Sequence, residues 1–161
     1  MTKPRLGWGS RRREGVDSRL MTFWQLYYHV VWGTKKREHI ITDNRIDLIR
    51  TSLTATALEH EAIVHAIGIM PDHVHVAISI PPKIAVADLI GRMKGAASRR
   101  VNLETRSEID GFGWQPEYGV FSFSQRGLND VVSYVENQRE IHAKRLTKPI
   151  YERSDTSYKH S

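Results

Sequence analysis

The stretch GIMPDHVHVAISIPP, residues 68–82, is typical of a buried strand, except that two histidines interrupt it. In the strand that it predicts over 73–80, the large aliphatic side chains share one face: Val74, Val76, Ile78 and Ile80. His73 and His75 fall on the opposite face with two small residues. We expect the aliphatic face to pack on helices and the histidines to face an open or functional side of the sheet. Such a pair can bind one metal ion, although it is also common on ordinary sheet surface.

The elements around this stretch follow from changes in the hydrophobic period. Residues 62–70 predict the strand that pairs with 73–80 across the turn Met70-Pro71-Asp72, and Pro81-Pro82 ends the pair. The other predicted elements are, in chain order, a strand at 22–34, a helix at 43–60, a helix at 85–101, a strand at 118–124 and a helix at 128–145. This order predicts an α+β fold: a ferredoxin-like (RRM-like) β-α-β-β-α-β antiparallel sheet with an added C-terminal helix that carries Tyr134.

The length and composition favour a single domain without thiol chemistry. The chain has 161 residues, 40% of them hydrophobic, and no cysteine, so disulfides and thiolate metal sites are excluded. A metal ion would have to be held by histidine, carboxylate or amide groups. No apolar run approaches the ~20 residues of a membrane span, and the N-terminus has no hydrophobic signal segment, so we expect a cytoplasmic protein.

The positive charge is concentrated at the N-terminus. Of the formal net charge of +6, residues 1–20 carry +4, from six basic and two acidic side chains. Because this leader has little apolar periodicity and is followed by Met21, we predict that it is disordered and that either Met1 or Met21 is the true start. Its SRRR run is either a solvated tail or a nonspecific phosphate contact. We assign residues 21–147 to the folded domain and 148–161 to a C-terminal tail.

The last predicted helix carries a tyrosine and a glutamine that could complete a site. Tyr134 and Gln138 are four residues apart, so they stand one turn apart on the same helix face, at the border of its apolar stripe. Each has an ordinary interpretation, Tyr134 as an amphipathic rim residue and Gln138 as a surface amide. Only their meeting with His73 and His75 would favour a catalytic site over plain sheet surface.

Four segments occur in the order of one known family: YYHVVWGTKKRE, MPDHVHVAISIPPKIAVADLIGRMKGAASR, WQPEYGVFSFS and YVENQ. Over residues 22–145 the chain resembles the HUH single-tyrosine transposases, both the insertion-sequence type that moves as single-stranded DNA and its REP-associated relatives. The resemblance implies that His73 and His75 bind a metal, with Gln138 as third ligand, and that Tyr134 is the nucleophile. It also implies Mg²⁺ or Mn²⁺ as that metal.

The activity that the resemblance implies fits the chemistry of these residues. A phenol with a pKa near ~10 is a weak nucleophile at neutral pH, so it needs a phosphate that a metal makes electrophilic. The implied activity is cleavage and rejoining of hairpin-flanked DNA through a 5′-phosphotyrosine intermediate. The implied partner is single-stranded DNA with hairpin ends, so we expect the protein to be associated with the nucleoid.

Two other function classes remain open. A ferredoxin-like sheet with exposed aromatic side chains also binds single-stranded DNA or RNA, so a noncatalytic binding module, or a domesticated hairpin-binding protein, is the first alternative. A metal-dependent phosphoesterase acting on small molecules is the second. Neither alternative needs Tyr134 and Gln138 as a pair, and for this reason we rank the transposase first.

Basic and aromatic residues outside this set are candidates for DNA contacts. They are Lys35, Lys36, Arg37, Arg92, Lys94, Arg99, Arg100, Trp114 and Tyr118. Basic residues on a helix are more often a solvated face, and core packing explains the two aromatic side chains equally well.

The link before the last helix indicates an assembly. SQRGLND, residues 124–130, is short and contains Gly127, and a short hinge favours exchange of a terminal helix between two copies. The resemblance also implies dimers. We therefore expect a homodimer in which Tyr134 of one chain acts in trans on the histidines of the other.

Overall fold

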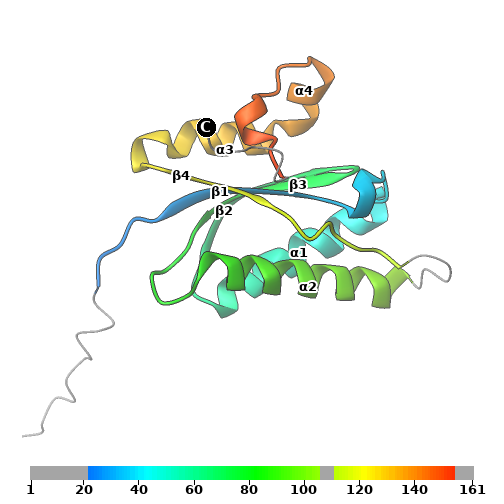
Figure 1. The fold of residues 1–161 in the computed structure, drawn as a ribbon, viewed down its shortest axis with the longest axis horizontal. Coiled ribbons are helices and arrows are strands. Elements are labelled where there is room, and N and C mark those ends of the chain that lie inside the picture. Colours follow the sequence, from blue (N-terminus) through cyan, green and yellow to red (C-terminus); the bar gives the residue numbers. More distant parts are fainter. Residues whose placement is uncertain (1–21, 106–110, 155–161) are drawn as a thin grey trace, which may run out of the picture.

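The computed structural model describes residues 22–105 and 111–154. The predicted basic leader and the choice between Met1 and Met21 lie outside these residues. In the described ranges, no helix combines the length and the apolar character that crossing a bilayer requires. The strands form one sheet with helices on both of its faces (Figure 1).

The sheet has the strand order of a ferredoxin-like fold. Its strands are β1 (Tyr27–Gly33), β2 (Ile63–Met70), β3 (His73–Ser79) and β4 (Gly119–Phe123). They lie in the order β2-β3-β1-β4, and every neighbouring pair is antiparallel. The predicted α+β class and topology are therefore confirmed, with β3 and β1 as the central strands.

Strand β1 begins at Tyr27, later than the predicted residue 22. Its partner β3 ends at Ser79, which pairs with Tyr27. Pro81 and Pro82 follow, and because proline has no backbone N–H, the ladder cannot continue along them. The proline pair therefore limits both strands.

Two long helices cover one face of the sheet: α1 (Asp43–Glu59) and α2 (Val86–Thr105) (Figure 1). Val74, Val76 and Ile78 of β3 are at most 1% exposed and share one hydrophobic core with Leu53 of α1 and Leu89 of α2. Full burial of such side chains stabilises a fold by roughly 1.5–3 kcal/mol each. The predicted packing of the aliphatic face on helices is confirmed.

The opposite face is covered by the C-terminal part of the chain. Helices α3 (Leu128–Glu136) and α4 (Gln138–Ala143) lie over it, followed by the 3-10 turn η4 (Pro149–Tyr151) (Figure 1). Valines of α3 pack on alanines of the sheet in a second core cluster: Val131, Val135, Ala66 and Ala77. The small alanine side chains leave room for the helix. Of the two expectations for the histidine face, the open side is therefore wrong, because His73 is 2% exposed and His75 0%.

The predicted helix 128–145 is in fact two helices. Between them, Asn137 has φ −96° and ψ 22°, outside the helical region. Its Nδ2 donates a 2.8 Å hydrogen bond to the carbonyl of Ser133. Asparagine competes for backbone groups in this way and so favours helix ends. α4 consequently leaves the direction of α3 (Figure 1).

Gly68 allows α3 to approach β2 closely. A Cβ at this position would lie 2.2 Å from the carbonyl oxygen of Val135 and 2.8 Å from Cγ of Gln138. Any larger residue would therefore displace the junction of α3 and α4.

The first residues of the predicted tail also pack on the fold. A Cβ on Gly119 would lie 1.7 Å from the carbonyl oxygen of Arg153, so the two backbones are in close contact. Gln115 Nε2 donates hydrogen bonds to the carbonyl oxygen (3.1 Å) and to Oγ (2.7 Å) of Ser154. These contacts hold residue 152 over the sheet.

Candidate active site

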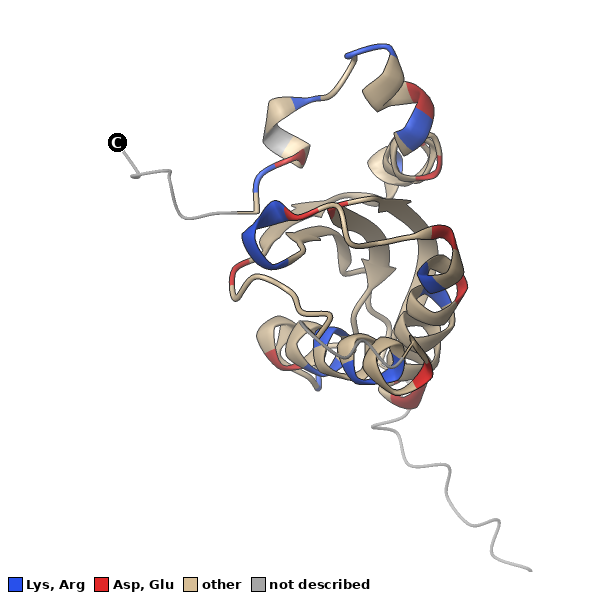
Figure 2. Ribbon diagram, turned by 90° about the vertical axis from the view of Figure 1, so that its right-hand side faces the viewer, with Lys and Arg blue, Asp and Glu red and all other residues tan. Residues whose placement is uncertain are grey.

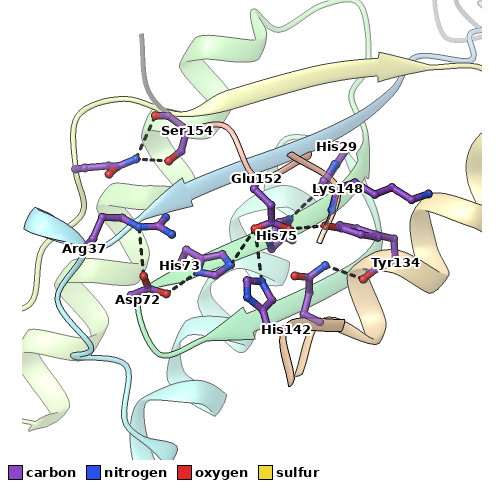
Figure 3. Close-up of polar contacts among 12 residues, drawn as sticks. His29, Arg37, Asp72, His73, His75, Tyr134, His142, Lys148, Glu152 and Ser154 are labelled. Carbon is purple, nitrogen blue, oxygen red and sulfur yellow. Dashed lines mark hydrogen bonds and ion pairs between the residues drawn. The ribbon is translucent and has the colours of Figure 1, made fainter. Parts of the chain in front are cut away.

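Two buried histidines of the central strand β3 form the base of the site (Figure 3). The ring centroids of His73 and His75 are 5.0 Å apart. Nδ1 of His73 donates to Oδ1 of Asp72 at 2.6 Å, and Nδ1 of His75 shares a 2.9 Å hydrogen bond with Nε2 of His29. Because both Nδ1 atoms are engaged, each ring is left with Nε2 for another partner.

Asp72 is itself held in place. Its Oδ2 lies 3.3 Å from Nε of Arg37. Burial alone would raise the pKa of Asp72, but the hydrogen bond to His73 and the neighbouring positive charges lower it below its ordinary value. A carboxylate behind a histidine is the usual support of a metal-binding imidazole, because it fixes the tautomer and raises the basicity of the ring.

Burial determines the charge of the two paired histidines. It lowers the pKa of His29 to about 3, with a further decrease from the charge of His75. Burial also lowers the pKa of His75, although Glu152 partly opposes this. Both rings are therefore neutral at pH 7, and neutral imidazole is the form that binds metal ions.

Tyr134 of α3 lies beside these histidines in the same chain (Figure 3). Its ring centroid is 6.1 Å from that of His75. Its hydroxyl donates a 2.5 Å hydrogen bond to Oε1 of Glu152 and accepts a 3.0 Å hydrogen bond from the backbone N–H of Lys148. Burial, with a contribution from Glu152, raises the pKa of Tyr134 to about 12. The phenol is therefore protonated in this arrangement.

Glu152 connects the tyrosine to the histidines. Its Oε2 lies 3.5 Å from Nε2 of His73, 3.4 Å from Nε2 of His75 and 3.5 Å from Nε2 of His142. Burial would raise the pKa of Glu152, but the contact with His75, the hydrogen bond from Tyr134 and the charge of His73 lower it to about 2. The carboxylate is thus ionised at the centre of the cluster.

Gln138 begins α4 and is also buried, at 1% exposure. Its Nε2 donates a 2.8 Å hydrogen bond to the carbonyl of Tyr134. Its Oε1 makes no hydrogen bond. The structure therefore brings all four residues expected from the sequence, Tyr134, Gln138 and the two β3 histidines, to one face of the sheet.

The unpartnered atoms of the site fit a metal ion. Buried atoms without a hydrogen bond include the amide oxygen of Gln138 and Nε2 of three histidines, which are His73, His75 and His142. One ligand atom from each of these histidines and from Glu152 lies within 4.8 Å of the others. Buried polar atoms without partners are costly, and a divalent ion would satisfy them.

Two members of this cluster, His142 and Glu152, were not predicted from the sequence. His142 lies four residues after Gln138, but the change of direction at Asn137 brings it to the histidines, so helix spacing alone does not identify it. Glu152 carries no local signal, because packing of its neighbours Arg153 and Ser154 on distant residues brings it to the histidines.

The predicted DNA contacts fall in different places (Figure 2). Lys35, Lys36 and Arg37 form the short turn η2 (Lys35–Arg37) directly after β1, on the same side as the Arg37 to Asp72 ion pair. The arginines of α2 lie with α1 in the layer beneath the sheet and line a groove between these helices: Arg92, Arg99 and Arg100. The second group is therefore separated from the histidines by the sheet.

Lys94 and Trp114 have structural partners. Lys94 Nζ donates to the carbonyl oxygens of Gln115 at 2.7 Å and Pro116 at 3.0 Å. Trp114 Nε1 donates a 3.0 Å hydrogen bond to the carbonyl of Lys94, and its ring packs edge-on against Phe112. Tyr118 packs against the main core. These contacts attach the segment before β4 to α2.

A single chain supplies every side chain of the cluster. The ring centroid of Tyr134 lies 6.1 Å from that of its own chain's His75. The homodimer and the action of Tyr134 in trans both stay predictions.

Comparisons with known proteins point to one family. Residues 22–138 match the family described as "Transposase IS200 like". The ISDra2 transposase TnpA of Deinococcus radiodurans is 28% identical over 121 residues, which are 73% of this chain and 86% of that protein.

Two solved structures have a similar fold. A crystal structure described as a transposase from Deinococcus radiodurans R1 has a TM-score of 0.58 and 27% identity, and the match covers 73% of this chain and 93% of that one. A REP-associated tyrosine transposase bound to a REP hairpin has a TM-score of 0.57 and covers 86% of this chain and 94% of that one. At its 13% identity the likeness concerns the fold alone. Since the family match spans most of the chain and includes the β3 histidines, Tyr134 and Gln138, the chain belongs to the IS200-like family of HUH single-tyrosine transposases.

Proposed function

We propose that this DNA-transposing enzyme cleaves and rejoins hairpin-flanked single-stranded DNA through a 5′-phosphotyrosine on Tyr134. The observation that carries the proposal is the meeting of a buried phenol with a buried histidine cluster through one carboxylate, Glu152. Neither a binding module nor a small-molecule phosphoesterase needs a tyrosine at this position.

The chemistry assigns a role to each group. His73, His75 and Gln138 would hold Mg²⁺ or Mn²⁺, and the bound ion would withdraw charge from the scissile phosphate. Tyr134 Oη then forms a bond to phosphorus while the bond between phosphorus and the 3′ oxygen breaks. The tyrosine proton passes along the hydrogen bond to Glu152 Oε1, and the departing 3′ oxygen takes up a proton from water. Because the phosphotyrosine is still a phosphodiester, a 3′-hydroxyl can reverse the step without ATP.

The DNA partner is supported by a structural relative and by local charge. The REP-associated relative is described as bound to a REP hairpin. In this chain, Lys35 and Lys36 are exposed on the turn next to Arg37 and Asp72, and we assign phosphate contacts to them. We keep the arginines of α2 as a second, more distant candidate surface for the backbone of a hairpin or a flanking strand.

A covalent-adduct assay tests the proposal. A hairpin oligonucleotide with a cleavable flank is labelled at its 3′ end, because a 5′-phosphotyrosine retains the downstream fragment. With Mg²⁺ or Mn²⁺, the wild-type protein should carry the label through a denaturing gel. Tyr134→Phe should lose the adduct but bind the hairpin within a few-fold of wild type.

The same assay separates the alternatives. If the protein binds the hairpin but forms no adduct with any metal ion or any flanking sequence, the noncatalytic module is favoured. Turnover of a small phosphodiester by Tyr134→Phe would favour the phosphoesterase.

A further inference from the structure

We propose that His142 and Glu152 join His73 and His75 as ligands of the metal centre, and that this centre therefore takes a transition ion in preference to Mg²⁺. The inference deepens the proposed function, on which it rests for the role of the ion. It adds two ligands that neither the family pattern nor the sequence assigns.

The distances around Glu152 fit one particular coordination geometry. Its Oε2 is nearly equidistant from the three Nε2 atoms, at 3.5, 3.4 and 3.5 Å. In a tetrahedral site with bonds of about 2.1 Å, ligand atoms lie about 3.4 Å apart, whereas neighbouring ligands of an octahedral site lie about 3.0 Å apart. The three distances from the carboxylate oxygen are thus those between neighbouring tetrahedral ligands, and all four ligand atoms lie within 4.8 Å of one another.

The histidines are prepared for this role by their other partners. Nδ1 of His73 is held by Asp72, and Nδ1 of His75 is held by His29. The Nε2 atoms of both rings and of His142 are buried and make no hydrogen bond. Nε2 of His142 is buried although 28% of the His142 side chain is exposed. Its ring centroid lies 5.0 Å from that of His73.

The ligand types decide the class of metal. Mg²⁺ prefers oxygen ligands in octahedral geometry and keeps several waters. Three imidazoles favour first-row transition ions, with affinity rising from Mn²⁺ through Co²⁺ towards Zn²⁺ and Cu²⁺. A centre with three nitrogens and one carboxylate oxygen is therefore a poor site for Mg²⁺ and a good one for Zn²⁺, Co²⁺ or Mn²⁺.

Glu152 can be tested without removing any ligand, because its position depends on packing elsewhere. A Cβ on Gly119 would lie 1.7 Å from the carbonyl oxygen of Arg153. Gly119→Ala should therefore push the chain segment next to Glu152 away from the sheet while all four ligands remain. A loss of metal affinity in this variant would show that the ion needs the Glu152 carboxylate at its observed position, because the carboxylate itself is unchanged.

The experiment is a Co²⁺ titration of the full chain without DNA, followed by visible absorption, which is strong for four-coordinate and weak for six-coordinate Co²⁺. Wild type should bind one Co²⁺ with strong bands, and Zn²⁺ but not excess Mg²⁺ should displace it. His142→Ala and Glu152→Gln should each lower the affinity for Co²⁺ at least about tenfold, and Gly119→Ala should do the same. His60→Ala, at the end of α1 on the other side of the sheet, is the matched control and should leave the bands unchanged.

Circular dichroism and the melting temperature of each metal-free variant identify any variant that fails to fold. If Glu152→Gln or Gly119→Ala does not fold, the Co²⁺ affinity of the other variant tests the role of Glu152. If His142→Ala and Glu152→Gln bind Co²⁺ like wild type while His73→Ala does not, the proposal is overturned and the proposed DNA cleavage is untouched. If the protein binds four-coordinate Co²⁺ but never forms a DNA adduct, the proposed function is wrong and the proposed metal ligands are supported.

Discussion

The hydroxyl of Tyr134 donates a 2.5 Å hydrogen bond to Glu152, a residue 18 positions further along the chain. The second oxygen of the same carboxylate lies 3.4 Å from Nε2 of His75. One side chain therefore contacts both the proposed nucleophile and the histidine cluster. Movements of residue 152 should consequently affect the hydroxyl of the tyrosine and the metal centre together.

Metal binding should stabilise the folded chain, because three buried imidazole nitrogens lack hydrogen-bond partners. At a free metal concentration 100 times its Kd, linkage predicts about 2.7 kcal/mol of added stability, which raises the melting temperature by several degrees. Calorimetry with Mn²⁺ and with EDTA measures this shift. His73→Ala should lose most of it, and an unchanged shift in that variant would place the ion elsewhere.

Acid should destabilise the fold through His29. This residue is 0% exposed, and burial is the main cause that lowers its pKa from 6.5 to about 3. Between these two values the unfolded chain binds a proton that the folded chain excludes, so stability falls as the pH falls. The slope from this one group is at most about 1.4 kcal/mol per pH unit. Urea unfolding in EDTA from pH 7 to about pH 4 should give a flatter profile for His29→Phe, and identical slopes would argue against this assignment.

Gly68→Ala should loosen α3 from β2, because the new Cβ would lie 2.2 Å from the carbonyl oxygen of Val135. The expected loss of stability is about 1–3 kcal/mol, with a lower yield of adduct because Tyr134 is on the displaced helix. Gly95→Ala is the control: its Cβ would meet nothing within 4 Å, and alanine in a helix should stabilise by about 0.5–1 kcal/mol. Equal urea midpoints for the two variants would show that the close contact is unimportant.

Mixing two inactive variants distinguishes cis from trans chemistry. Because Tyr134 lies beside its own chain's His75, a mixture of Tyr134→Phe and His73→Ala should form no more adduct than either variant alone. Subunit exchange must be verified by light scattering or by labelled chains. Restored cleavage would mean that α3 is exchanged between chains in solution.

Most of the fold could be predicted from the sequence, because the patterns that specify its strands and helices are local. The alternation in 73–80 identifies a half-aliphatic strand, and Pro81-Pro82 marks its end. The order of strands and helices then leaves few topologies, and the observed one is the ferredoxin-like choice. The error over the open face has a physical cause: Ala77 and Ala66 are small, so their side of the sheet accepts a helix.

Only part of the site could be predicted from the sequence, because the positions of His142 and Glu152 depend on the packing of residues far apart in the chain. Gln138 and Tyr134 follow from a spacing of four residues and from the family resemblance. Glu152 reaches the site through close packing of Arg153 on Gly119 and hydrogen bonds from Gln115 to Ser154. Lys94, a candidate DNA contact from its charge, donates to the carbonyls of the segment before β4.

The break at Asn137 has a consequence for the reach of the chain. In one continuous helix, Tyr134 and His142 would be about 12 Å apart along the axis, because each residue adds about 1.5 Å. The chain instead changes direction after Glu136, and His142 ends with its ring centroid 5.0 Å from that of His73. A residue at position 137 that prolongs the helix would carry His142 past the cluster. The choice of amino acid at this single non-ligand position therefore sets how many imidazoles the site contains.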